Sequence, residues 1–167
     1  MAIKSDRNFP DDLLHALGAL TVTYSSLDTQ IKLLTWRLIN PKVQSVGKIV
    51  TATLSMANLL NLLSSLFRLH TRDASLVTRM EALVARVDGL SHERNDMIHA
   101  VWVSRPDRDS AIRGKVSSRR GKGLSEHATP IKAEAVYALA ARVEEARRDV
   151  VDLEYAIVNS STALREE

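Results

Sequence analysis

The stretch 76-LVTRMEALVARVDGLSHERNDMIHAVW-102 carries the clearest structural signal in this sequence. Its apolar residues recur at alternating steps of four and three, which is the spacing of one face of an amphipathic helix. These positions are Leu76, Met80, Leu83, Val87 and Leu90, followed by Met97 and Val101. Arg94 occupies the step between Leu90 and Met97. The pattern predicts a helix to about Trp102, with an arginine where a core residue is expected.

An arginine at an apolar position needs partners, because an unpaired buried charge costs several kcal/mol. On an ideal helix His99 lies about 140° around from Arg94, at the edge of the apolar face. Two interpretations stay open. In the structural one, the Arg94 head reaches solvent or pairs with a carboxylate, and His99 is an ordinary boundary histidine. The candidate carboxylates are Glu81, Glu93 and Glu154. In the functional one, Arg94 and His99 form a site.

The run Glu93–Trp102, ERNDMIHAVW, closely resembles the Arg-x4-6-His signature of the HEPN superfamily. In that family a polar residue often follows the arginine, as Asn95 does here. The segment 25-SSLD-28 also resembles a Leu-acidic step of small bacterial members. The resemblance covers about residues 10–164 and implies a bundle of four or five helices, usually dimeric, with the motif near the dimer interface. It also implies either a metal-independent ribonuclease, often a toxin or antiviral effector, or a non-catalytic member.

Arg94 and His99 suit RNA cleavage that uses no metal ion. Histidine can act as base and as acid because its unperturbed pKa is about 6.5. Arginine stays charged and matches phosphoryl oxygens. A two-fold dimer would bring two copies of both residues into one cleft. Asn95 lies one turn before His99, so we expect it to orient the imidazole or bind the substrate. Val101 stands where some family members carry a tyrosine that a nucleotidyltransferase modifies, so we expect an antitoxin to act by binding.

Further apolar patterns predict the remaining helices. The first helix is expected from Asp11 or Asp12 to Asn40-Pro41, a short one over 43–50, and another from about Ser55. The last helix is expected to start at Thr129-Pro130. Its apolar positions are Val136, Leu139, Val143, Ala146, Val150, Leu153 and Ile157. Those of the first helix are Leu13, Leu17, Leu20, Tyr24, Leu27, Ile31, Leu34 and Leu38. The predicted fold is all-α, an antiparallel bundle of four or five helices with a basic loop before the last helix.

Residues 104–130 differ in composition from the rest of the chain. They hold seven basic and three acidic residues, a net charge of +4, whereas the other residues hold sixteen basic and seventeen acidic. Because the segment has three glycines, few apolar residues and no aromatic ones, we expect an exposed loop, with an irregular hairpin around 111–120 as the alternative. Two functions are weighed for it, a solubilising insertion and an arm that binds phosphates. The candidate phosphate ligands are Arg119, Arg120 and Lys122.

Composition and motifs exclude several other classes. The chain has no cysteine and its five histidines show no compact ligand spacing, so we expect no metal and no cofactor. There is no Gly-rich phosphate loop and no nucleophile-elbow motif. Residues 1–10 are expected to be a flexible N-terminus without the apolar stretch of a signal peptide, followed by a single domain over 11–164. No segment is apolar enough to span a membrane, so we expect a cytoplasmic protein.

Two functions from different classes follow from these observations. The first is a metal-independent endoribonuclease of toxin or antiviral-defence type, with an Arg/His site shared by a homodimer. Its expected partners are RNA, a second copy of the chain and an antitoxin or other regulatory protein. The alternative is a non-catalytic HEPN-like helical module that binds RNA, a nucleotide or a protein partner. The sequence does not separate the two, since the same arginine and histidine would serve a binding pocket.

Overall fold

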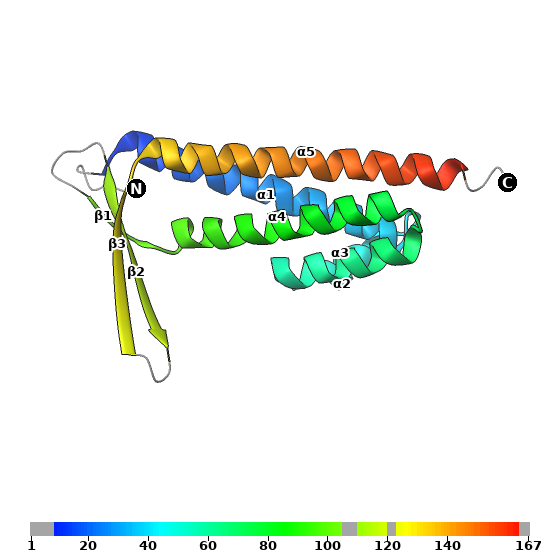
Figure 1. The fold of residues 1–167 in the computed structure, drawn as a ribbon, viewed down its shortest axis with the longest axis horizontal. Helices are drawn as coiled ribbons and strands as arrows, with labels where there is room; N and C mark the ends of the chain where they lie inside the picture. The colour runs from blue at the N-terminus through cyan, green and yellow to red at the C-terminus, as the bar shows by residue number, and fades with distance from the viewer. Residues whose placement is uncertain (1–8, 105–109, 120–122, 164–167) are drawn as a thin grey trace. The chain divides into compact units, whose positions relative to one another are not determined.

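The computed structural model describes residues 9–104, 110–119 and 123–163. Within them, five helices and three short strands follow in the order α1, α2, α3, α4, β1, β2, β3, α5 (Figure 1). The predicted fold class, an all-α helical bundle, is confirmed. The chain divides into two compact units, one made of Met1–Thr23 and His92–Ala141 and the other of Tyr24–Ser91 and Arg142–Glu167. Among the helices described, none is long and apolar enough to cross a membrane.

Helix α1 (Asp11–Ile39) begins directly after Pro10, as predicted. Asp11 and Asp12 lie in its first turn, where negative charge favours the positive end of the helix dipole. The helix ends before Asn40, whose side-chain oxygen accepts hydrogen bonds from the backbone N–H groups of residues 42 and 43 and so forms a turn. Six of the eight predicted apolar positions are fully buried, and Leu17 and Tyr24 are half-buried.

Helices α2 (Gln44–Thr51), α3 (Met56–His70) and α4 (Ala74–Ile98) follow. Two of their N-termini carry side-chain caps. Ser55 accepts a hydrogen bond from the Asn58 backbone, and Asp73 accepts bonds from residues 75 and 76. Such caps satisfy backbone donors that a helix leaves open at its start. The predicted apolar face of α4 from Leu76 to Leu90 is buried, so this prediction is confirmed.

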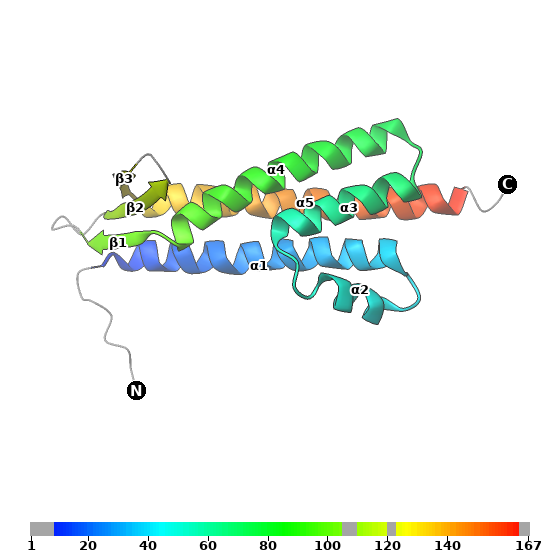
Figure 2. The same ribbon diagram turned by 90° about the horizontal axis from the view of Figure 1, so that it is seen from below.

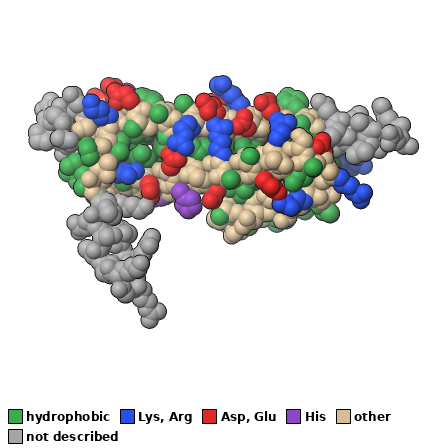
Figure 3. Space-filling model, in the orientation of Figure 1, with side chains coloured by type: hydrophobic (Ala, Val, Ile, Leu, Met, Phe, Trp, Pro, Cys, Tyr) green, Lys and Arg blue, Asp and Glu red, His purple; other side chains and the backbone are tan. Residues whose placement is uncertain are grey.

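In the second unit, α4 and α5 (Ala133–Ala163) pack antiparallel. Arg86 of α4 forms ion pairs with Glu145 at 2.8 Å and with Asp149 at 2.5 Å. A hollow of about 280 Å³ beside these pairs is lined by Arg79 of α4 and Leu153 of α5, so the two helices run in opposite directions. Figure 3 shows basic and acidic side chains intermixed along the visible helical face, as such pairing requires. All seven predicted apolar positions of α5 are buried.

Helix α1 is joined to both α4 and α5 by buried or half-buried polar contacts of the second unit. Tyr24 donates a hydrogen bond to the Ser91 hydroxyl at 2.7 Å. Glu154, a buried residue of α5, accepts a hydrogen bond from Gln30 at 2.9 Å and pairs with Arg37 at 2.5 Å. A buried carboxylate needs such partners because desolvation is otherwise too costly. Glu154 was one of the carboxylates considered for Arg94, and it binds Arg37 instead. A second one, Glu81, pairs with Arg68.

Helix α2 lies beside the C-terminal half of α1 (Figure 2). The buried residues of α2 are both small: Gly47 and Thr51. The Thr51 hydroxyl accepts a hydrogen bond from the indole N–H of Trp36 at 2.7 Å. A Cβ on Gly47 would lie 2.8 Å from the Trp36 Cα, so the two helices touch at backbone distance. The close approach explains why a glycine occupies the middle of this short helix.

The first unit contains an antiparallel sheet of order β1-β2-β3. Strand β1 (Val101–Ser104) pairs with the start of β2 (Ala111–Arg119), and β2 pairs along its length with β3 (Gly123–Ile131). The register places Trp102 opposite Arg113 and Ser104 opposite Ala111. Beyond Gly114 only two strands remain, and they form the ribbon labelled β2 and β3 in Figure 1.

The structure differs here from the expectation of an exposed basic loop over 104–130 with, at most, an irregular hairpin. Helix α4 also stops at Ile98 and not near Trp102, and α5 starts at Ala133 and not at Thr129-Pro130. The residues after Ala100 begin with Val101, Trp102 and Val103, which are β-branched and aromatic types that favour strands. The backbone of this segment pairs with residues 111–114. Pairing between residues so far apart leaves little trace in local periodicity.

Candidate functional site

The C-terminal end of α4 holds two of the predicted site residues side by side. Arg94 is half-buried, and its Nη1 donates a hydrogen bond to the side-chain oxygen of Asn95 at 3.1 Å. Its Nε is fully buried. Asn95 is exposed, and its amide oxygen accepts this hydrogen bond from Arg94, so its expected role in orienting the imidazole or binding the substrate stays a prediction. The contact fixes one edge of the guanidinium.

His99 follows directly after the end of α4. Its backbone N–H still donates to the Asn95 carbonyl at 3.0 Å, as in a last helical turn. Its imidazole is exposed and makes no hydrogen bond or ion pair to any residue that the structure describes. Within one chain the structure thus brings Arg94 together with Asn95 and leaves the His99 ring open to a substrate or a second molecule.

The end of α4 is held in place by an aromatic pair. The indole N–H of Trp102 donates to the Met97 carbonyl at 3.0 Å, and so satisfies one of the carbonyls that a helix leaves open at its end. Phe9 packs edge-on against Trp102, with ring centroids 6.2 Å apart and planes at 84°. These contacts join β1 to the last turn of α4. The segment between the helix and the strand, which contains His99, is therefore held at both ends by regular structure.

Arg113 is a further basic residue at this turn, which the sequence did not single out from its neighbours. It is half-buried on β2, and its Nη1 lies 3.7 Å from the sulfur of Met97. Its Nε is buried and makes no hydrogen bond within the described part of the chain. The two apolar residues before it, Ala111 and Ile112, were the available signal, but so short a run does not identify a strand.

Of the remaining predicted ligands, Arg119 alone has a backbone that the structure describes. Arg119 is the last residue of β2, where it pairs with Gly123. The side chain of Arg119 and both Arg120 and Lys122 lie outside the described residues. The phosphate-binding role assigned to these three residues therefore stays a prediction.

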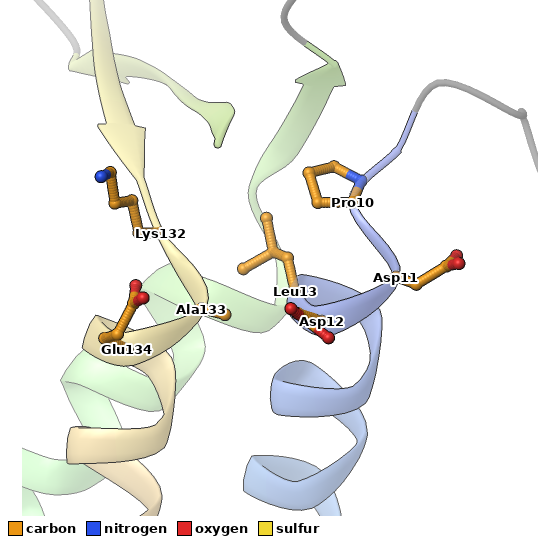
Figure 4. Close-up of a pocket in the computed structure, with 7 residues that line it drawn as sticks. All are labelled: Pro10, Asp11, Asp12, Leu13, Lys132, Ala133 and Glu134. Atoms are coloured by element: carbon orange, nitrogen blue, oxygen red, sulfur yellow. The ribbon is translucent and has the colours of Figure 1, made fainter. Parts of the chain in front are cut away.

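A hollow of about 380 Å³ lies in the same unit, where α1 and α5 begin. Figure 4 shows that it is lined by Asp12 and Leu13 from α1 and by Lys132, Ala133 and Glu134 from the start of α5, whereas the carboxylate of Asp11 points away. Carboxylates are ordinary in first helical turns because they favour the helix dipole. The hollow contains no paired acid and base and no nucleophile, so we assign it no chemistry.

Among the residues described, no group of three or more His, Cys, Asp or Glu side chains is placed to hold a metal ion. No protein-family model, curated protein sequence or solved structure matches the chain. The residues at the end of α4 are therefore the basis on which a function can be assigned.

Proposed function

We propose that this protein is a HEPN-like, metal-independent endoribonuclease of toxin or antiviral-defence type, acting in the cytoplasm as a homodimer. One observation carries the proposal. An exposed histidine, His99, follows a helix whose C-terminal end holds a half-buried arginine, Arg94, fixed by Asn95. The spacing and the residue types are those that the Arg-x4-6-His resemblance implies for RNA cleavage.

In the proposed reaction a ribose 2′-hydroxyl attacks the adjacent phosphorus, and the bond from phosphorus to the 5′-oxygen breaks. One His99 accepts the proton of the 2′-hydroxyl, and a second imidazole donates a proton to the departing 5′-oxygen. Arg94 binds the non-bridging oxygens, whose charge grows in the transition state. The products are a 2′,3′-cyclic phosphate and a 5′-hydroxyl, and water can later open the ring to a 3′-phosphate.

The need for two imidazoles supports a dimer. One histidine cannot accept one proton and donate another in the same step, and none of the other four histidines follows an arginine with four residues between them. His99 of the partner subunit would supply the second group if the two motif turns face one cleft. A regulatory protein such as an antitoxin would then act by covering this cleft, since Val101 offers no hydroxyl for modification.

The test is cleavage of single-stranded RNA by purified protein in EDTA, with analysis of the product ends. We expect cyclic phosphate or 3′-phosphate ends. His99→Ala should lower the rate on the order of 10²–10⁴-fold, the usual contribution of a general acid or base. Arg94→Ala should lower it by about 10²–10³-fold, as for loss of one transition-state donor. Both variants should keep the free energy of unfolding within about 0.5 kcal/mol, because neither side chain belongs to the packed core.

His70→Ala is the matched control, because His70 is also an exposed histidine at the end of a helix, α3. It should leave cleavage unchanged. Metal-dependent products that persist in His99→Ala would overturn the ribonuclease proposal. A large fall in melting temperature for Arg94→Ala would make that arginine a structural residue. RNA binding without cleavage would favour the non-catalytic module.

A further inference from the structure

Arg113 has an unusual set of neighbours for a half-buried arginine. Other arginines of the helices meet carboxylates: Arg37 meets Glu154, Arg86 meets Glu145 and Asp149, and Arg147 meets Glu144. Arg113 meets the thioether of Met97, which is a weak acceptor, and its buried Nε makes no hydrogen bond to a described residue. A guanidinium normally satisfies its donors, so this group is arranged to receive an anion that the described part of the chain does not supply.

The position of Arg113 is fixed by regular structure. Met97 lies three residues after Arg94 on α4, so these two residues share one face at its C-terminal end. Trp102 is bonded to the Met97 carbonyl and stands opposite Arg113 in the β1–β2 register. Strand β2 therefore brings Arg113 to the helical turn that carries Arg94, within one compact unit of the chain.

Strand β2 continues away from this turn with basic residues at alternate positions. Arg113, Lys115 and Arg119 fall on one face of the strand, because successive residues alternate between faces. Glu126 pairs in register with Val116 and so belongs to the other face. Beyond Gly114 this part of the ribbon has no third strand beside it. The face is thus a row of positive positions that starts at the proposed site.

We propose that Arg113 binds the phosphate next to the scissile one, so that the substrate is an extended single strand with at least two phosphates. This inference rests on the proposed function of Arg94 and His99. Arg94 takes the scissile phosphate, since one guanidinium fork matches the two non-bridging oxygens of one phosphodiester. Arg113 then holds its neighbour. The site therefore discriminates against dinucleotides, which contain a single phosphodiester.

The experiment compares a dinucleotide with a short single-stranded RNA as substrates. Wild-type protein should give the higher kcat/KM on the longer strand. R113A should lose most of that preference through KM, because kcat/KM on the longer strand falls much more than kcat/KM on the dinucleotide. R113K keeps the charge but not the fork, so it should recover part of the preference. R79A removes one exposed arginine from α4 and is the charge-matched control, which should behave as wild type.

A binding assay keeps this inference separate from the proposed catalysis. Anisotropy of a labelled 2′-O-methyl RNA, which cannot be cleaved, is measured at increasing salt. R113A should reduce the slope of log affinity against log salt by about 0.7, the value for one phosphate contact on a single strand. R113M, which keeps apolar contact with Met97, replaces R113A if the latter does not fold. An unchanged slope, or an equal loss on the dinucleotide and the longer strand, would overturn the role of Arg113.

Discussion

Glu144 of α5 lies against two arginines of its own helix. Both guanidinium nitrogens that face it from Arg147 are 2.8 Å from its carboxylate oxygens, and Arg148 is 3.3 Å away. The hydrogen bonds from Arg147 are the main reason that the pKa of Glu144 falls from 4.5 to about 2. The folded state therefore binds this proton more weakly than the unfolded chain does, and the pair stabilises the fold only while the carboxylate is ionised.

The sign of the pH effect follows from the lowered pKa. The contribution of Glu144 is fully present above pH 4.5 and is lost as the pH falls toward 2. For a partly exposed pair within one helix it should amount to about 0.5 kcal/mol. Urea unfolding at pH 7 and at pH 2.5 should show that E144Q lacks this part of the acid destabilisation. E134Q, which changes an exposed carboxylate in the first turn of α5, should retain it. Identical acid profiles for E144Q and wild type would contradict the assignment.

Of the two arginines at the proposed site, the sequence singled out only Arg94. The helical period placed Arg94 at an apolar position, and the structure finds it half-buried. The partner of Arg94 was not predictable, because two of its candidate carboxylates pair with other arginines. Arginine side chains of α1 and α3 pair with Glu154 and Glu81, respectively. Arg113 was not predicted as a ligand at all, since its position depends on strand pairing with β1.

At the scale of elements, the contact of α2 with α1 depends on Gly47 having no side chain. A Cβ added at Gly47 would lie 2.7 Å from Cδ1 of Trp36 and 2.8 Å from its Cα. The tryptophan ring can rotate, but the backbone of a long helix cannot retreat without cost. By contrast, a Cβ at Gly18 of α1 or Gly89 of α4 would meet nothing within 4 Å.

We therefore expect opposite effects from the same substitution at different helical glycines. Gly47→Ala should destabilise the protein by about 1–3 kcal/mol, the usual cost of overpacking, and should break the bond between Trp36 and Thr51. Gly18→Ala should stabilise it by about 0.5–1 kcal/mol, because alanine has the higher helix propensity. Thermal unfolding followed by circular dichroism measures both. A stabilising Gly47→Ala would mean that α2 does not pack on α1 as described.

The helices were predictable from the sequence and the strands were not, for a physical reason. Each long helix buries a continuous stripe of apolar residues, and a stripe repeats locally in the sequence. The ribbon of β2 and β3 has no such stripe, because polar and charged residues occupy many of its positions and its stability comes from backbone pairing. The end of α4 was also misplaced, since Trp102 caps the helix by a bond to the Met97 carbonyl that no periodic pattern encodes.

At the scale of the whole molecule, the proposed site is incomplete in one chain. The sequence predicted both motif residues and the helix that carries Arg94, but it placed His99 inside the helix. The structure puts His99 just beyond the helical end, with its ring exposed. An exposed imidazole can reach a second molecule in a way that a ring on a continuous, packed helix cannot. The exposed ring agrees with the composite site that we propose, in which a second copy of the chain supplies the other imidazole.

A mixture of two inactive variants tests this composite site. Light scattering should first show a species of about twice the 18.5 kDa chain mass. Co-expression of Arg94→Ala with His99→Ala, each with its own tag, then gives mixed dimers that tandem purification isolates. Such a dimer keeps one Arg94 and one His99, on different chains but in the same cleft. Its cleavage rate should exceed that of the His99→Ala dimer, whose cleft holds no imidazole, and stay below that of wild type, because the second imidazole is missing.

The alternative arrangement gives a different result in the same experiment. If each chain cleaves RNA with its own Arg94 and His99, the mixed dimer contains no complete pair and its rate should equal that of the single variants. Mixed dimers of His70→Ala with wild type control for the tags and the co-expression, and they should cleave at the wild-type rate. A protein that stays monomeric at concentrations of tens of micromolar, yet cleaves RNA, would also exclude the shared cleft. Recovery in the mixed dimer alone would establish that two chains build one site.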